Sequence, residues 1–374
     1  MNFSRFDDIR PYYDDEIHDA MVRIAHSESF PLLASYVFPD VPIRTVRKRL
    51  CSYRTVREFQ TDTMKLMNER VIENSISKFS CNGVEHVCND VPCLFVSNHR
   101  DIMLDSSLLQ YVLVMNGLDT TEITFGENLM MSPLIIDIGR ANRMFRVDRP
   151  KDNMRNFYDR ALHLSEYIRH VISEKKRSVW IAQRNGRTKD GIDRTDQGII
   201  KMFCMSCQDN RVKALDDLHI VPVAVSYEWE PCDILKALEV FKSQFAEYTK
   251  KPGEDLHSIL TGLLDFKGEV HMEICKPIGM AELCACGHLT DNDFHRSVAK
   301  LIDTRINAAY RLFPNNYIAH DLLYGCSQYG DRYNDVQKNN FILRMKKLEG
   351  LDSCNLELLR NIFLGIYSNP VDNR

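Results

Sequence analysis

Two residues with acid–base chemistry, His99 and Asp105, stand close together in this sequence. They follow the stretch 91–98, Val-Pro-Cys-Leu-Phe-Val-Ser-Asn, whose apolar and β-branched residues predict a strand. A histidine at the edge of a sheet can act as a general base. An acid a few residues further on can hold the imidazole in one tautomer and stabilise the imidazolium that forms. The pair therefore predicts a general-base site.

Basic residues in two later segments favour an anionic substrate. Arg149 follows a predicted helix that ends near residue 140, and a fixed guanidinium there can hold a phosphate through two hydrogen bonds. A surface salt-bridge cluster is the competing interpretation of Arg149. The segment 180–191 changes from a strand to a basic loop in which glycine lets the backbone approach a ligand. It lacks the Gly-Lys-Ser/Thr pattern of a nucleotide-binding loop. The candidate substrate-binding residues are Arg149, Arg184, Asn185, Gly186, Arg187 and Lys189.

Composition narrows the class of protein. The 374 residues are 44% hydrophobic and 27% charged with a net charge of -4, which is typical of a soluble globular protein and argues against general nucleic-acid binding. The first ten residues lack the apolar core of a signal peptide, and we find no apolar run near the ~20 residues of a spanning helix. Attachment to a membrane surface stays open.

The 12 cysteines predict reduced, mostly buried thiols rather than disulfides. Cys204 and Cys207 have the spacing of half a zinc site, but Cys284, Cys286 and His288 do not complete it. We therefore predict no metal.

Hydrophobic periodicity divides the chain into three regions. Residues 1–90 predict a helical region, with helices over 14–30 and 43–79, and the basic run 44–54 is either a solvated helix face or a surface for anionic lipid. Residues 91–284 predict an α/β layer, a mixed sheet flanked by helices, and 285–374 a helical extension.

Expected strands are 93–97, 178–182, 219–227 and 269–275, with a long helix over 154–175. Pro222 favours a bulge or an edge position for the third strand, and Tyr227 to Glu230 are interpreted as a surface loop or part of an acceptor pocket.

The ordered motifs resemble the glycerolipid acyltransferases, the family of the glycerol-3-phosphate and lysophosphatidic acid acyltransferases. That family has four blocks: His-x4-Asp, Gly-x-x-Phe-x-x-Arg, a Pro-Glu-Gly-x-Arg-like loop, and a late strand with Val-Pro. The similar positions here are His99 with Asp105, Arg149, the loop 185–187, and Ile220 to Pro222. The resemblance covers about residues 90–280 and is closest to a branch of glycerol acyltransferases in the Bacteroides group of bacteria.

This sequence departs from the family at three positions. Five residues separate His99 from Asp105, where the family has four; we favour Asp105 over Asp101 as the acid. Asn185 replaces the glutamate of the third block, and Arg143 and Arg146 stand where the second block has glycine and phenylalanine. These changes leave the role of position 185 open.

The resemblance implies a mechanism and partners. His99 takes the proton from a glycerol hydroxyl that attacks an acyl thioester of acyl carrier protein or coenzyme A, and Asp105 orients His99. We find no Gly-x-Ser-x-Gly motif, which agrees with direct transfer and no acyl-enzyme. The acceptor is glycerol-3-phosphate or lysophosphatidic acid, no cofactor is needed, and the protein is expected at the cytoplasmic face of the membrane. Alternatives are O-acylation of a hydroxyacyl aminolipid and a non-catalytic lipid-binding protein on the same fold.

Overall fold

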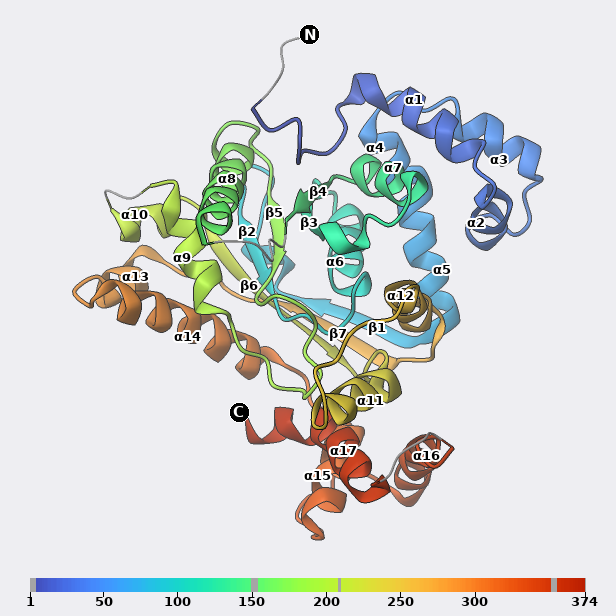
Figure 1. The fold of residues 1–374 in the computed structure, drawn as a ribbon, viewed down its shortest axis with the longest axis vertical. Helices are drawn as coiled ribbons and strands as arrows, with labels where there is room; N and C mark the ends of the chain where they lie inside the picture. The colour runs from blue at the N-terminus through green and yellow to red at the C-terminus, as the bar shows by residue number, and fades with distance from the viewer. Residues whose placement is uncertain (1–4, 149–153, 208–209, 351–354, 374) are drawn as a thin grey trace.

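A seven-stranded mixed sheet forms the centre of the protein (Figure 1). The computed structural model describes residues 5–148, 154–207, 210–350 and 355–373. The strand order is β1-β7-β6-β2-β5-β3-β4; β6 and β7 pair antiparallel, and all other neighbours pair parallel. The strands are β1 (Ile76–Asn82), β2 (Leu94–Ser97), β3 (Glu122–Gly126), β4 (Met144–Val147), β5 (Val179–Ala182), β6 (Ile220–Tyr227) and β7 (Gly268–Ile274).

The central strands are apolar on both faces because helices cover both faces of the sheet. In β2, Leu94 and Val96 pack into one hydrophobic layer, whereas Phe95 packs into the layer on the opposite face. The first layer is covered by five helices, which Figure 1 shows on one side of the sheet: α8 (Met154–Ser173), α9 (Gln197–Met205), α10 (Arg211–Asp216), α13 (Met280–Cys286) and α14 (Asp291–Ala309). This arrangement is the predicted α/β fold, a mixed sheet flanked by helices.

The opposite face is covered mainly by α5 (Lys65–Ser75) and α6 (Leu104–Met115). Val71 of α5 and Leu104, Leu108 and Val112 of α6 pack against Phe95 and its neighbours. Short helices η2 (Val84–His86) and η3 (Glu127–Leu129) flank this layer, and α7 (Pro133–Ala141) follows η3. The N-terminus of α6 thereby lies directly after β2, where the predicted acid–base pair falls.

The N-terminal region is helical as far as Ser75, and its helices share a hydrophobic core with α7. They are α1 (Asp14–Ala25), α2 (Phe30–Val37), α3 (Ile43–Leu50), α4 (Val56–Phe59) and the π-helix η1 (Gln60–Met64), followed by α5. The predicted helix over 43–79 is wrong at its end, because Ile76 begins β1. This strand pairs parallel with β7, so a segment of the region expected to be helical belongs to the sheet.

The C-terminal helices pack on one another and on α11 (Asp233–Ser243). These helices are α15 (Pro314–Tyr324), α16 (Asp335–Lys346) and α17 (Leu356–Asp372), and they confirm the helical character expected after residue 285. The preceding α12 (Glu254–Leu264) packs near α5 instead. Among the helices that the structure describes, none is both long enough and apolar enough to cross a membrane.

The sheet has strands that the sequence did not predict. All four expected strands are present, but β3 and β4 were missed, and β1 was assigned to a helix. The edge position expected for the strand of Pro222 is wrong, since β6 lies between β7 and β2. Its pairing with β2 runs without a register shift from Ile220 to Val223, so the bulge is also absent from that pairing. The carbonyl of Pro222 still accepts a hydrogen bond from the Cys275 N–H at 2.9 Å.

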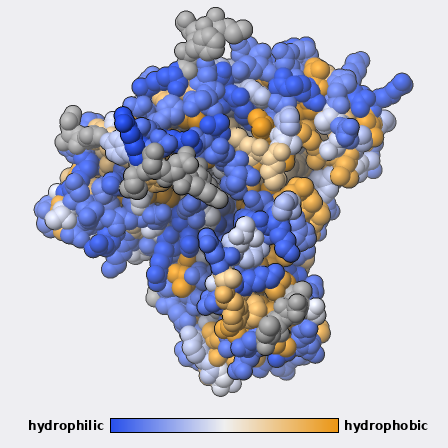
Figure 2. All heavy atoms as spheres, viewed as in Figure 1, coloured by the Kyte–Doolittle hydropathy of each residue, from blue (hydrophilic) through white to orange (hydrophobic). Residues whose placement is uncertain are grey.

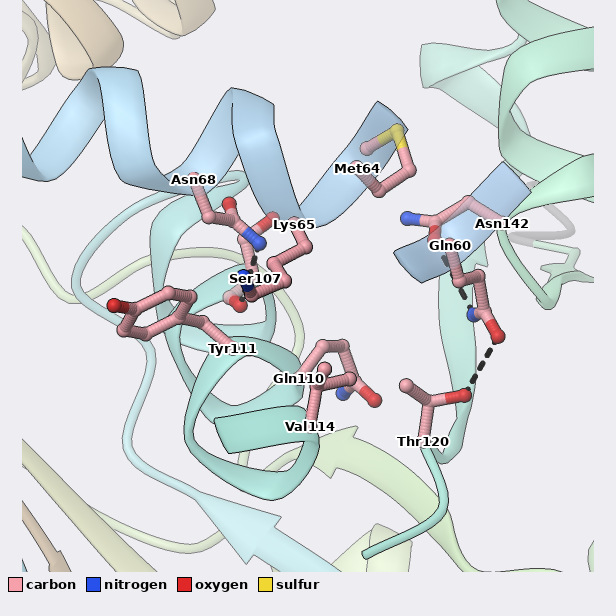
Figure 3. Close-up of a pocket in the computed structure, with 10 residues that line it drawn as sticks. All are labelled: Gln60, Met64, Lys65, Asn68, Ser107, Gln110, Tyr111, Val114, Thr120 and Asn142. Atoms are coloured by element: carbon pink, nitrogen blue, oxygen red, sulfur yellow. Dashed lines mark hydrogen bonds between the residues drawn. The ribbon is translucent and has the colours of Figure 1, made fainter. Parts of the chain in front are cut away.

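A small pocket lies where η1 and α5 meet α6 (Figure 3). Gln60 accepts a hydrogen bond from the Thr120 hydroxyl at 2.7 Å and donates to Asn142 at 3.3 Å. The amide of Asn68 donates to the Ser107 carbonyl at 3.1 Å. These bonds fix the N-terminal helices against the core, and His99 is not among the residues that line the pocket.

The close approach of Gly191 to α17 predicts a stability effect. Gly191 has φ +76°, and a Cβ there would lie 2.1 Å from the carbonyl oxygen of Ile366. We expect Gly191→Ala to lower the free energy of unfolding by about 3 kcal/mol or more, since it combines backbone strain with a clash against main chain. Gly117→Ala is the matched control, with φ +71° and no atom within 4 Å, and should cost only about 1 kcal/mol. Urea unfolding of both variants measures the difference; equal losses would contradict the packing argument.

Candidate active site

The candidate site lies at the carboxyl edge of three adjacent parallel strands, β5, β2 and β6. Asn98, the first residue after β2, is fixed to β6 through its side chain. Its Nδ2 donates to the Val225 carbonyl at 3.0 Å, and its Oδ1 accepts from the Val225 N–H at 2.8 Å. The turn that carries His99 is therefore fixed to the neighbouring strand at its first residue.

His99 and Asp105 are in direct contact. The distance from His99 Nδ1 to Asp105 Oδ2 is 3.1 Å, and the side chains of His99 and Asp105 are 13% and 1% exposed. A carboxylate can only accept a hydrogen bond, so Nδ1 carries the proton and Nε2 keeps its lone pair. The ring of Trp180 from β5 lies edge-on to the imidazole, with centroids 6.2 Å apart. The arrangement leaves Nε2 able to accept a proton.

Asp105 accepts hydrogen bonds from four groups. Besides His99, the backbone N–H groups of Arg100 and Asp101 donate to Oδ2 at 2.7 and 2.9 Å. The hydroxyl of Tyr227, at the end of β6, donates to Oδ1 at 2.8 Å. Burial and the nearby carboxylate of Asp105 hold the pKa of Tyr227 well above its usual value, so the hydroxyl stays a donor. These donors offset the cost of burying the Asp105 carboxylate.

Asp101, the other candidate acid, has a different position. Its Oδ1 accepts from the N–H groups of Met103 and Leu104 at 2.8 and 2.9 Å, so it caps the start of α6. Its other oxygen is buried and faces α12, where a Cβ on Gly262 would lie 2.2 Å away. The extra residue between His99 and Asp105 thus lies in a turn before α6, and the hydrogen bonds to Asp101 stabilise this turn.

Arg100, which lies between His99 and Asp101 in the chain, points into a buried network of charges. Its guanidinium donates to Asp193 at 2.6 Å and to Glu230 at 3.3 Å. Lys236 donates at 2.6 Å both to Glu230 and to the Arg100 carbonyl. Burial disfavours the charged form of Arg100, but Asp193 and the other neighbours outweigh it, so its pKa is raised well above the usual value. The two cations, Arg100 and Lys236, balance the two carboxylates, Asp193 and Glu230, and the network fixes the turn through Arg100.

The basic loop after β5 is bonded to the same turn. The N–H of Thr188 donates to the His99 carbonyl at 2.8 Å. Beside it, Arg187 is only 9% exposed, and its buried NH1 has no hydrogen-bond partner. Arg187 lies near Cys232, whose thiol pKa is raised to about 11 by burial and Asp101, partly offset by Arg187. A buried guanidinium nitrogen without a hydrogen-bond partner, in a loop bonded to the turn of His99, is a candidate for holding an anion.

The other predicted substrate-binding residues differ in their surroundings. Asn185 is exposed, Arg184 and Gly186 are half-buried, and Gly186 has φ +79°. Lys189 is already paired with Glu239, which makes it a weaker candidate than Arg187. Arg149 lies outside the described residues.

Several residues of the site were not predicted from the sequence. Tyr227 and Glu230 were interpreted as a surface loop or acceptor pocket, but the structure buries both. Asp193 and Lys236 were not singled out at all. The one signal for Tyr227 was its place at the end of a strand adjacent to that of His99; nothing local marks the buried network.

A histidine at the carboxyl edge of an α/β sheet, hydrogen-bonded to a buried carboxylate, has the geometry that acid–base transferases and hydrolases use. Residues 78–226 match the model of the family described as Acyltransferase, and this segment includes His99, Asp105 and Arg187. The match supports the resemblance to the glycerolipid acyltransferases and an acyltransferase activity for the α/β core.

Two further comparisons complete these findings. No curated protein sequence matches the chain significantly. Among solved structures, the 1-acyl-sn-glycerophosphate (LPA) acyltransferase PlsC from Thermotoga maritima is similar, with a TM-score of 0.39 and 12% identity, over 78% of this chain and 94% of that chain.

The Tyr227 hydroxyl donates to Asp105, so if it positions the His99–Asp105 pair we expect Tyr227→Phe to lower kcat for acyl transfer roughly tenfold with little change in KM. A hydrogen bond to a charged group contributes about 1.5–3 kcal/mol. Because Asp105 keeps its other three donors in the variant, only part of this free energy is expected to appear in the activation barrier. Steady-state kinetics measure the effect.

Tyr167→Phe is the control, since Tyr167 is also buried but donates to Glu122, away from His99. If both variants lose kcat equally, the Tyr227 hydroxyl acts only through stability.

Proposed function

We propose that the protein transfers a fatty acyl group from an acyl thioester to a hydroxyl of glycerol-3-phosphate or lysophosphatidic acid in membrane lipid synthesis. Two observations support this most directly: His99 contacts Asp105, and Arg187, whose buried NH1 has no hydrogen-bond partner, precedes Thr188, which donates to the His99 carbonyl. In this proposal His99 removes the proton of the reacting hydroxyl, and Arg187 binds the phosphate. Within this proposal the protein belongs to the Bacteroides-type branch of glycerol acyltransferases.

The proposed reaction is a direct transfer. Nε2 of His99 removes the proton of the acceptor hydroxyl while its oxygen attacks the thioester carbonyl. The tetrahedral intermediate expels the thiolate, and the imidazolium returns the proton to the sulfur. Asp105 stabilises the imidazolium throughout. A positioned general base contributes about 10²–10⁴ in rate, and the activated thioester makes an acyl-enzyme unnecessary.

The acceptor's phosphate is assigned to Arg187. Its guanidinium can bind phosphate through two parallel hydrogen bonds, which a lysine cannot do. Arg184, Asn185 and Gly186 line the same loop, and Arg149 belongs to the proposed set through the family motif. Lys189 has a smaller role because Glu239 already neutralises it. The acyl donor is acyl carrier protein or coenzyme A carrying the chain, and no resident cofactor takes part.

The buried NH1 of Arg187, which has no hydrogen-bond partner, favours a phosphorylated acceptor over a hydroxyacyl aminolipid, which offers no phosphate to bind it. The intact His99–Asp105 contact favours an enzyme over a non-catalytic lipid-binding protein, since the longer spacing does not separate the two side chains.

Thiol release measures the proposed activity. With acyl carrier protein or coenzyme A thioesters and glycerol-3-phosphate or lysophosphatidic acid, wild type should release thiol in an acceptor-dependent way. His99→Ala should lower kcat by about 10²–10⁴. Arg187→Ala should raise KM for the phosphorylated acceptor roughly 10- to 100-fold, whereas the control Lys189→Ala should change it little.

Each other outcome has a distinct meaning. Transfer only to an aminolipid, unaffected by Arg187→Ala, would show that the acceptor is a hydroxyacyl aminolipid and not a phosphorylated glycerol. Absence of release from folded wild type with every acceptor would leave the lipid-binding alternative.

The proposed location is the cytoplasmic face of the membrane, held peripherally. The basic run of residues 44–54 begins in α3, where Arg44 and Lys48 are exposed. The neighbouring α2 exposes Leu32 by 75% and Leu33 by 39%. Figure 2 shows apolar residues in this region and again over α12, whose exposed large apolar residues include Leu256, Leu260 and Leu264. Adjacent apolar and basic side chains are the chemistry of an interfacial membrane contact.

Vesicle binding tests this location. Wild type should sediment with vesicles that contain phosphatidylglycerol at low salt, and less so at high salt. Arg44→Ala with Lys48→Ala should weaken binding roughly 25-fold, about fivefold for each cation, and Leu32→Ser should weaken it further. Leu343→Ser, at a leucine of α16 that is 60% exposed, is the control. Equal binding to neutral and anionic vesicles would contradict the proposal.

A further inference from the structure

A second cluster of reactive side chains lies in the C-terminal helices, away from His99. We propose that His320, Asp321 and Cys326 bind a divalent transition-metal ion of the zinc type. His320 and Asp321 end the buried face of α15, and Cys326 follows in the turn after the helix. One ligand atom from each residue lies within 4.8 Å of the others; in the described part of the chain no other group of three histidine, cysteine or acidic residues does so.

The distances suit a tetrahedral ion. Cys326 Sγ lies 3.5 Å from Asp321 Oδ1, and His320 Nδ1 lies 3.6 Å from the same oxygen. With metal–sulfur bonds of ~2.3 Å and metal–nitrogen or metal–oxygen bonds of ~2.0–2.1 Å, tetrahedral angles place such ligand pairs about 3.3–3.6 Å apart. The three side chains therefore need little movement to enclose an ion.

The histidine is oriented as a ligand. His320 is only 7% exposed, and its buried Nδ1 has no hydrogen-bond partner. Its other nitrogen, Nε2, lies 3.5 Å from Asp372 Oδ1 in α17. Histidine ligands of metals usually direct their second nitrogen to a carboxylate, which fixes the tautomer. The rings of Tyr324 and Tyr329 pack on His320 with centroids 4.6 and 4.9 Å away.

Asp321 is held by groups that do not compete for an ion. The Tyr329 N–H donates to its two oxygens at 3.2 and 3.1 Å, and the Tyr333 hydroxyl donates to Oδ2 at 3.0 Å. In the metal-free protein the Cys326 thiol donates to Oδ1, and metal binding replaces this bond after the thiol loses its proton to solvent.

The site is open on one side, because Cys326 is exposed. Three protein ligands leave one tetrahedral position for water or another small ligand. The ion joins α15 to the turn that follows it and, through His320 and Asp372, to α17. Its expected effect is therefore on the stability of the C-terminal helices, independent of acyl transfer.

Cobalt(II) titration of the purified full chain tests the site. We expect one equivalent to bind with a thiolate-to-metal charge-transfer band and the visible bands of tetrahedral cobalt, and zinc to displace it. Cys326→Ser should abolish the charge-transfer band, and His320→Gln should weaken binding at least tenfold. Asp372→Asn should weaken it roughly tenfold, as removal of a residue that orients a ligand does.

Two controls keep the result decisive. Cys284→Ser removes another exposed cysteine and should leave the cobalt spectrum unchanged. In wild type, zinc should protect Cys326 from alkylation, measured by mass spectrometry of the peptide, and should leave Cys284 reactive. The proposal is overturned if wild type binds no cobalt, if the band persists in Cys326→Ser, or if zinc leaves Cys326 unprotected.

Discussion

The buried carboxylate of Asp105 is the constraint on which the candidate site depends. A carboxylate removed from water is stable only if donors replace the water, and Asp105 obtains them from the turn before its own helix and from Tyr227 on another strand. This requires β6 to lie next to β2, and the sheet order provides that neighbour. The same requirement orients His99, because the imidazole is one of the four donors.

Three consecutive residues of the turn are each held by neighbouring parts of the molecule. His99 contacts Asp105 of α6, Arg100 enters the network of Asp193 and Glu230, and Asp101 accepts from the first N–H group of α6 while facing Gly262 of α12. A turn held at each of these residues has little freedom to change the direction of the imidazole. This arrangement explains how a spacing one residue longer than the family motif still brings His99 and Asp105 together.

The sequence predicted those parts that a local pattern determines. Buried strands such as β2 and β6 are continuous apolar runs, and His99 and Asp105 are near neighbours in the chain. β4 is four residues long, and Ile76 and Phe79 fitted a helical period as well as a strand, so β4 and β1 were not identified. The partners of Arg100 lie 93 and 130 residues away. Only the folded chain brings such residues together, and no local spacing marks them.

The hydrogen bonds that hold the turn also connect it to α17. The N–H of Glu230 donates to the Tyr367 hydroxyl, which in turn donates to Asp233, while Glu230 itself binds Arg100. These contacts span 137 and 134 residues, and contacts of such long separation form late in folding. On the ribosome, the turn that carries His99 can therefore reach its final packing only after α17 has been synthesised. A partly made chain would then hold His99 and Asp105 without the full set of contacts that orients them in the finished protein.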